Sequence, residues 1–321
     1  MRLLDLVNNC KRIGITGHSN PDGDCAGSCC AAALFLRKVL PGAQVDIYLE
    51  ALPAALEKNI PGTETILHTV PEDAEKYDAF ILLDSVPERS GDAQKLYQDA
   101  SLKINIDHHI SNPGNGDVNY IDAGASSACE LVYNVIDHDA IDREIARALY
   151  VGIVTDTGVF QYSSTGESTM RAAGHLMSYG FDFTAVIREV FFERTALQAR
   201  ILGEAFVRSE LSMNGKCIFS ILNKALLDQY GASRQDLDGI SAQLALTEGI
   251  DCAVFLHEDE PGIWRSSMRS VRIVNVARLA SLFNGGGHIR AAGCTITSDI
   301  DEAVRTLRSD IEQQLRDAGA L

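Results

Sequence analysis

The sequence has no long apolar run and far fewer basic than acidic residues. Its most apolar segment, residues 25–36, has twelve residues and ends at Arg37 and Lys38, whereas about 20 are needed to span a bilayer. Lys and Arg number 28 against 44 Asp and Glu, which gives a formal net charge of -16. Because such a surface repels polyanions, broad binding to duplex nucleic acid or to an anionic membrane is disfavoured.

The cysteines form no metal-binding or disulfide pattern. Eight cysteines are scattered along the chain without a Cys-x-x-Cys pair, so we expect reduced and mostly buried thiols. No small-residue cleavage site follows an apolar segment near the start, which favours a cytoplasmic protein. With 46% hydrophobic and 22% charged residues among 321, the composition predicts two folded domains.

Short apolar runs alternate with helical patterns, which predicts an α/β fold with a mostly parallel sheet. The predicted strands are residues 12–17, 45–49, 79–84 and 102–107. Helices are expected at 25–40, 126–137 and 143–156, with Ser126 and Asp142 as N-caps. A continuous helix over 184–209 would connect to a smaller α/β domain with strands at 217–222 and 252–257 and helices at 240–247 and 300–318. The predicted domains are 1–185 and 209–321, with residues 186–208 between them.

Carboxylates and histidines gather at the ends of four predicted elements. They are His18, Asp22 and Asp24; Asp84; Asp107, His108 and His109; and Asp156. One such loop alone indicates only a turn and a helix cap. Four together are better explained by metal, which neutralises the repulsion between carboxylates. The mixed ligands favour Mn²⁺, Co²⁺, Fe²⁺ or Zn²⁺ over Mg²⁺ alone, and two ions would activate a hydroxide for phosphoester hydrolysis.

Residues 262–298 contain no Asp or Glu, whereas the chain average would place about five there. This stretch is either a strand-rich segment with solvated arginines or an anion site. Three adjacent glycines, Gly285, Gly286 and Gly287, permit close backbone approach to a phosphate. Arg269 and His288 offer charged donors in the same stretch.

These motifs together resemble the DHH phosphoesterase family. His18-x-Asn20-Pro21-Asp22-x-Asp24, Asp84, 107–109 and Asp156-Thr157-Gly158 are similar, in order, to its four signature motifs. Arg269-Ser270, 284–288 and 291–293 resemble the nucleotide-binding motif of the DHHA1 domain. The resemblance implies an N-terminal DHH domain with a mostly parallel sheet flanked by helices, a linker helix and a smaller C-terminal α/β DHHA1 domain.

The resemblance also implies a role for each residue. His18 and Asp22 would hold one Mn²⁺, Asp24, His108 and Asp156 a second, and Asp84 would bridge them, with Co²⁺ or Mg²⁺ as substitutes. Asp107 would orient an imidazole, and His109 would contact the scissile phosphate. Arg269, the three glycines and His288 would bind substrate. Asn284 stands where the family usually has a further glycine, and because Asn tolerates left-handed backbone angles we expect the loop to keep its shape.

The implied activity is that of the nanoRNase and pAp phosphatase group of this family. Its substrates would be short single-stranded oligonucleotides, cut to mononucleotides, and 3′-phosphoadenosine 5′-phosphate (pAp), converted to AMP. Long duplexes and membranes are not expected partners, and a homodimer is compatible with the family. Two alternatives stay open: a soluble cyclic-di-AMP or pApA phosphodiesterase, and a nucleotide sensor without catalytic activity.

Overall fold

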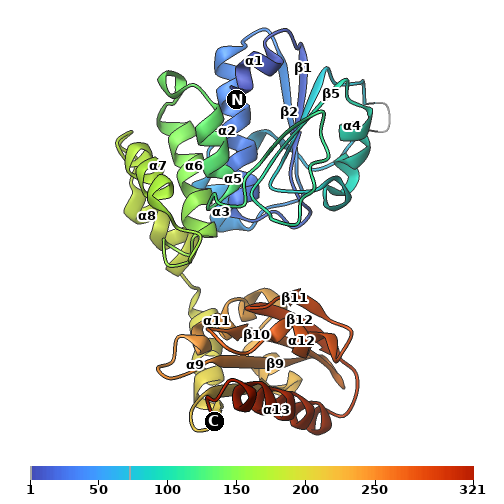
Figure 1. The fold of residues 1–321 in the computed structure, drawn as a ribbon, viewed down its shortest axis with the longest axis vertical. Coiled ribbons are helices and arrows are strands. Elements are labelled where there is room, and N and C mark those ends of the chain that lie inside the picture. The colour runs from blue at the N-terminus through green and yellow to red at the C-terminus, as the bar shows by residue number, and fades with distance from the viewer. Residues whose placement is uncertain (1, 72–73) are drawn as a thin grey trace. The chain divides into compact units, whose positions relative to one another are not determined.

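The computed structural model describes residues 2–71 and 74–321. The chain forms two compact units, Met1–Glu193 and Arg194–Leu321, which are drawn in Figure 1. The boundary between the units falls within the segment predicted to connect two domains. Among the described residues, no helix is both long and apolar enough to cross a membrane.

The first unit is built on a six-stranded sheet in which all neighbouring strands run parallel, in the order β3-β2-β1-β4-β5-β6. The strands are β1 (Arg12–Thr16), β2 (Gln44–Tyr48), β3 (Ile66–Leu67), β4 (Ala79–Leu83), β5 (Leu102–Asp107) and β6 (Val118–Ile121). All four predicted strands of this domain are present. The two edge strands, β3 and β6, are short and were missed because an edge strand needs no continuous apolar run.

Helices cover both faces of this sheet (Figure 1). The helices of this unit are α1 (Leu3–Val7), α2 (Gly23–Val39), α3 (Ala54–Asn59), α4 (Gln94–Asp99), α5 (Ala128–Val135), α6 (Arg143–Asp156), α7 (Glu167–Met177) and α8 (Phe183–Ile187). The last two, α7 and α8, pack on α6, outside the layer that covers the sheet. Four short 3-10 turns complete the unit before α6: Thr63–Thr65, Pro87–Arg89, Gly91–Ala93 and His138–Ala140. Alternate residues of β4 pack on opposite sides, Ile81 against the α2 and α6 layer and Phe80 against Tyr97 of α4.

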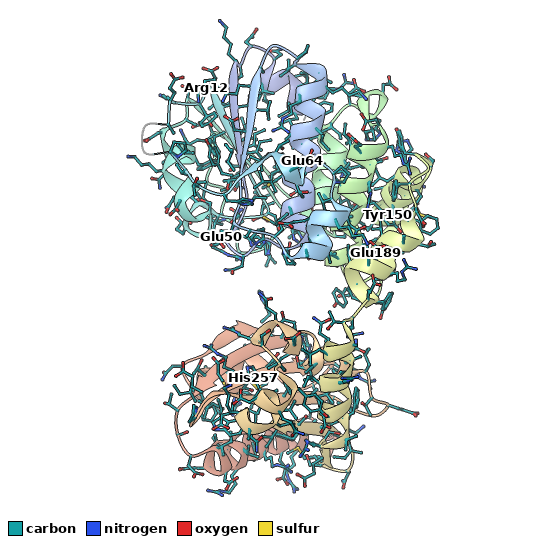
Figure 2. All side chains as sticks on the ribbon, turned by 180° about the vertical axis from the view of Figure 1, so that it is seen from behind. Arg12, Glu50, Glu64, Tyr150, Glu189 and His257 are labelled. Atoms are coloured by element: carbon teal, nitrogen blue, oxygen red, sulfur yellow. The ribbon has the colours of Figure 1, made fainter. Side chains whose placement is uncertain are left out.

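Close packing of α2 on α6 brings the ends of these two helices together. Gly152 of α6 lies so near α2 that an added Cβ would stand 2.9 Å from Asp24 Oδ1, so only glycine fits without a shift. On the outer side of α6, the buried Tyr150 ring contacts Phe181, with 5.3 Å between ring centroids (Figure 2). The core therefore fixes α6 between α2 and the later helices.

Two local predictions were wrong. The N-cap of α5 is Ser127 rather than Ser126, because the Ser127 side chain accepts the backbone N–H of Glu130. The segment 184–209 is not one helix: α8 passes into a π-helical turn (Arg188–Phe192), and α9 (Ala196–Val207) starts afresh. The side chains of Thr195 and Gln198 form a capping box that begins α9, and this Thr-x-x-Gln pattern is a helix-start signal in the sequence.

The second unit contains a mixed six-stranded sheet in the order β11-β12-β10-β9-β8-β7. Its strands are β7 (Glu210–Ser212), β8 (Cys217–Leu222), β9 (Cys252–Glu260), β10 (Ile263–Ser270), β11 (Gly286–His288) and β12 (Ala291–Ile296). β8 and β9 run parallel, and the other pairs run antiparallel. One face packs on α9, α10 (Lys224–Tyr230), the 3-10 turn Arg234–Leu237 and α11 (Ile240–Ala245), and the other on α12 (Val276–Ser281) and α13 (Ile300–Asp317).

Candidate metal centre

The carboxyl ends of β1, β4 and β5 bring the predicted acidic and histidine residues of the first unit together. These strands are neighbours in the sheet, and the carboxyl ends of parallel strands open on one edge. His18 follows β1, Asp84 follows β4 and Asp107 ends β5. Asp24 in the first turn of α2 and Asp156 at the end of α6 complete the cluster.

Three carboxylates surround the His108 imidazole. Its Nε2 lies 3.4 Å from Asp84 Oδ1, 3.5 Å from Asp156 Oδ2 and 3.8 Å from Asp24 Oδ2. Ligand atoms of Asp24, His108 and Asp156 all lie within 4.8 Å of one another. This spacing lets a single cation contact all three groups.

His18 forms a second group on the other oxygen of Asp84. Its Nε2 lies 3.4 Å from Asp84 Oδ2 and 3.8 Å from Asp22 Oδ1. Asp22 also caps α2, because its Oδ1 accepts the backbone N–H groups of Asp24 and Cys25 at 3.0 Å. The turn-and-cap interpretation of this loop is therefore correct for Asp22, and it does not conflict with a place beside His18.

Asp84 lies between the two groups. It is 2% exposed, and its Oδ1 has no hydrogen-bond partner among the described residues. Its backbone is left-handed, with φ of 54°, which costs energy for a residue other than glycine. His108 Nε2 and His109 Nδ1 lie 3.4 Å from Asp84 Oδ1 but do not form hydrogen bonds to it. An unsatisfied buried carboxylate oxygen is costly, and a cation would compensate that cost. The cluster therefore fits a divalent metal.

Repulsion between the carboxylates of the cluster also favours a bound metal. Burial, together with the charges of Asp84 and Asp156, raises the pKa of Asp24 well above its ordinary value. Burial also raises the pKa of Asp156 to about 6. Burial would lower the pKa of His108, but Asp84, Asp24 and Asp156 raise it to about 10. Without metal the site therefore retains protons, which a divalent ion would displace.

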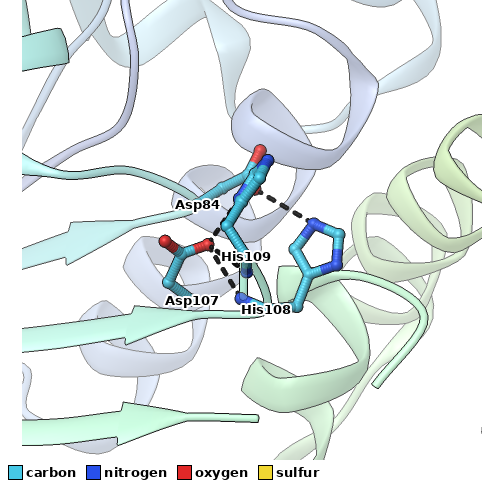
Figure 3. Close-up of side chains that lie close together, drawn as sticks. All are labelled: Asp84, Asp107, His108 and His109. Carbon is cyan, nitrogen blue, oxygen red and sulfur yellow. Dashed lines mark hydrogen bonds and ion pairs between the residues drawn. The ribbon is translucent and has the colours of Figure 1, made fainter. Parts of the chain in front are cut away.

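Asp107 holds the backbone and the ring of the next residues in place. Its Oδ1 accepts the backbone N–H groups of His108 and His109 at 2.8 and 3.2 Å and lies 2.8 Å from His109 Nδ1 (Figure 3). Its Oδ2 accepts Asn112 Nδ2 at 2.6 Å. Burial would raise the pKa of Asp107, but the hydrogen bonds from His109 and Asn112 lower it. The carboxylate is therefore charged and fixes the orientation of the His109 ring.

Sequence reasoning missed three residues that contribute to this arrangement. Asn112 is buried and links Asp107 to Ser85, which follows β4, and to Asn105 of β5, and no motif in the sequence marked it. The N–H groups of Ala128 and Cys129, at the start of α5, donate to Asp24 at 2.6 and 2.8 Å. A helix start was predicted here, one residue early at Ser126, but the contact of its N–H groups with Asp24 could not be read from the sequence.

The thiol of Cys25 lies beside the cluster. Its Sγ and ligand atoms of His18 and Asp84 lie within 4.8 Å of one another. Burial raises the pKa of this thiol well above its ordinary value. The thiol is therefore protonated near neutral pH, and a protonated thiol is a poor metal ligand.

All of the predicted substrate-binding residues of the second unit except His288 line one groove. Residues 284–287 and Arg269 line this groove, whose volume is about 860 Å³. His288, on β11, is exposed and is not among the lining residues. Asn284 has a φ of 55°, a left-handed angle that Asn tolerates.

The glycines of this loop are required by the hairpin itself. An added Cβ would lie 2.4 Å from Gly293 O at Gly285 and 2.5 Å from Ala291 O at Gly287. At Gly286 nothing lies within 4 Å of an added Cβ. The open space for a ligand is therefore at Gly286, whereas its two neighbours permit β11 to approach β12.

In comparisons with known proteins, each of the two units matches a family domain. Residues 12–153 match the DHH family N-terminal domain, and residues 214–317 match the DHHA1 domain. The chain is 31% identical over 303 residues to the bifunctional oligoribonuclease and PAP phosphatase NrnA of Bacillus subtilis, and the aligned region covers 92% of each chain.

The chain belongs to the DHH family. A second relative with the same name, from Thermus thermophilus, is 29% identical over 96% of this chain and 92% of its own. The solved structure of an exopolyphosphatase-related protein from Bacteroides fragilis has a TM-score of 0.86 and 24% identity, covering 96% of this chain and 94% of that chain. At this identity the structure shows a shared fold.

Proposed function

We propose that this DHH-family protein is a divalent-metal-dependent enzyme that removes mononucleotides from short single-stranded oligonucleotides and converts pAp to AMP. It is a hydrolase of phosphoester bonds. The observation that carries the proposal is Asp84, a buried carboxylate whose two oxygens face two separate histidine groups. The names of the two relatives, oligoribonuclease and PAP phosphatase, support the choice of substrate.

The ligand chemistry supports two Mn²⁺ ions, with Co²⁺ or Mg²⁺ as substitutes. His18, Asp22 and Asp84 would hold one ion, and Asp24, Asp84, His108 and Asp156 the other. Bound at this site, such ions supply Lewis acidity and lower the pKa of bound water.

His109 is the residue of this chain that we expect to contact the scissile phosphate. Its Nδ1 lies 2.8 Å from Asp107 Oδ1, so the Asp107 carboxylate holds this nitrogen as the donor. The hydrogen bond to Asp107 raises the pKa of His109, and the charge of Asp84 raises it further. The raised pKa favours the doubly protonated ring, whose Nε2–H can donate to a phosphate oxygen.

In the second unit, Arg269 and the backbone at Gly286 would bind a phosphate of the substrate. Arg269 Nη1 donates to Met268 O at 3.0 Å, which orients the guanidinium beside the loop. The net charge of -16 disfavours long polyanions, so we expect short substrates. The cytoplasmic location and the homodimer remain predictions.

One turnover panel tests the proposal. The full-length protein with Mn²⁺ should hydrolyse pAp and RNA and DNA oligonucleotides of two to five nucleotides. A long single strand, pApA, cyclic-di-AMP and pyrophosphate are tested for comparison. A preference for cyclic-di-AMP over the short oligonucleotides would support the phosphodiesterase alternative. Nucleotide binding without any turnover would support the sensor.

A matched pair of variants ties turnover to the cluster. Asp84→Asn removes a charge between the two histidine groups at nearly constant volume and should abolish hydrolysis. Asp92→Asn is the control, since Asp92 is an exposed residue of the 3-10 turn Gly91–Ala93 in the same unit. Full activity in Asp84→Asn would contradict the proposed site.

A further inference from the structure

The groove of the second unit extends well beyond the glycine loop. Arg269 and Arg265 lie on the same face of β10, four residues apart, which is about 13 Å along a strand. Beyond the loop, the far end of the groove is lined by Arg234, Asp238, His257 and Arg265. The volume of about 860 Å³ falls in the range of pockets that bind small molecules. A whole nucleotide therefore fits along the groove.

His257 is a buried histidine that lines this groove. It comes from β9 and lies within the second unit (Figure 2). The residue is 7% exposed, and neither Nδ1 nor Nε2 has a hydrogen-bond partner among the described residues. The ring stacks on Phe255, with 5.7 Å between centroids and 27° between planes.

Packing alone does not account for a histidine at this position. The residue paired with His257 on β8 is Leu222, which belongs to the apolar cluster of this face. An apolar side chain could fill the position of His257 without leaving two buried nitrogens unsatisfied. The imidazole therefore needs a partner that the described part of the chain does not supply.

The charges around His257 are balanced, which favours an uncharged ligand group. Arg265 pairs with Asp259 at 2.6 Å, and Arg234 and Asp238 line the groove close by. Burial lowers the pKa of His257 to about 4, and the nearby Arg234 and Arg265 oppose its protonation while Asp259 favours it. At neutral pH the ring thus has one donor and one acceptor nitrogen.

We propose that His257 hydrogen bonds to the base edge of a nucleotide whose phosphate lies at Arg269 and the glycine loop, and that it is a specificity-determining residue. The inference rests on the proposed function for the phosphate end. A base edge offers both donors and acceptors, which suits a neutral imidazole, and guanidinium planes such as those of Arg234 and Arg265 stack on bases. Rotation about the side-chain bonds turns a ring nitrogen into the groove, and an unpaired ring loses no hydrogen bond on turning.

The test is ligand binding by the full-length protein without added metal. AMP, ribose 5-phosphate and inorganic phosphate are titrated by calorimetry. His257→Leu should raise the Kd for AMP about 3- to 10-fold, the loss of one neutral hydrogen bond, and leave the Kd for the other two ligands unchanged. His257→Gln, which retains a donor and an acceptor, should recover part of the AMP affinity.

A stability measurement separates binding from packing. Because His257→Leu removes unsatisfied nitrogens, it should raise the melting temperature of the second unit while it weakens AMP binding. Arg272→Ala is the charge control, since Arg272 lies in the same acid-free stretch but does not line the groove, and it should leave the Kd for AMP unchanged.

Several outcomes would overturn the inference. An unchanged Kd for AMP in His257→Leu would exclude a base contact, and an equal loss of ribose 5-phosphate affinity would assign the ring to the sugar-phosphate end. A lower melting temperature in His257→Leu would indicate a packing role. Failure of the proposed function gives a different result: the wild-type protein shows no turnover, but its AMP binding still depends on His257.

Discussion

Asn112 should be essential to the stability of the first unit, although it lies outside every motif. Its Nδ2 carries two hydrogens, which three acceptors share: Asp107 Oδ2 at 2.6 Å, Asn105 Oδ1 at 3.0 Å and Ser85 O at 3.1 Å. Asn112→Ala leaves the buried Asp107 carboxylate without this donor. A hydrogen bond to a charged group contributes about 1.5–3 kcal/mol and a neutral one about 0.5–1.5 kcal/mol, so we expect a loss of about 2–4 kcal/mol.

Calorimetry of the full-length protein measures this loss. For a unit of this size, 1 kcal/mol shifts the melting temperature by about 2–4 °C, so the first unit should melt about 5–15 °C lower. The difference in melting temperature between Asn112→Ala and the wild type should become smaller as the pH falls. The lowered pKa of Asp107 stabilises the fold above the ordinary Asp pKa of about 3.9, and this stability is lost as protonation of Asp107 begins.

Two further variants make the prediction specific. Asn112→Asp places a second carboxylate against Asp107 and should destabilise the first unit at least as much at neutral pH, with recovery in acid. Asn115→Ala is the control, since its side chain makes a single bond of 3.3 Å to Asn112 Oδ1 in the same loop. If Asn112→Ala and Asn115→Ala had equal stability, the reasoning would be refuted.

Three other predictions concern the acid response, the metal and the helix contact. Burial lowers the pKa of His257 to about 4 in the folded protein, against about 6.5 in the unfolded chain. The free energy of unfolding of the wild-type protein should therefore fall by up to about 1.4 kcal/mol per pH unit as the pH drops from about 6.5 to about 4. Urea titrations of His257→Leu should lack this dependence on pH. Mn²⁺ at about a hundredfold excess over its Kd should stabilise the wild-type first unit by about 2.7 kcal/mol, and Asp84→Asn should abolish this thermal shift. Gly152→Ala, whose Cβ would stand 2.9 Å from Asp24 Oδ1, should cost about 1–3 kcal/mol. By contrast, the exposed Gly203→Ala in α9, with open space around it, should add about 0.5–1 kcal/mol.

The central strands and the order of the motifs could be read from the sequence. β1, β4 and β5 are nearly continuous apolar runs because helices cover both of their faces. Asp142 was correctly expected as the N-cap of α6, because a cap is a local interaction between neighbouring residues. The break before α9 was missed although its capping box was visible, because the apolar spacing continued across it.

The sequence by itself determined which residue types follow which strand, and therefore that carboxylates and histidines would meet at one edge of a parallel sheet. Only the tertiary structure decided that Asn112 supports Asp107, and that Asp84 Oδ1 and the buried His257 ring form no hydrogen bond within residues 2–71 and 74–321. Each of these facts depends on groups from distant segments that pack together. A linear pattern records the identity of a side chain, whereas burial and hydrogen-bond satisfaction depend on what the folded chain places around it.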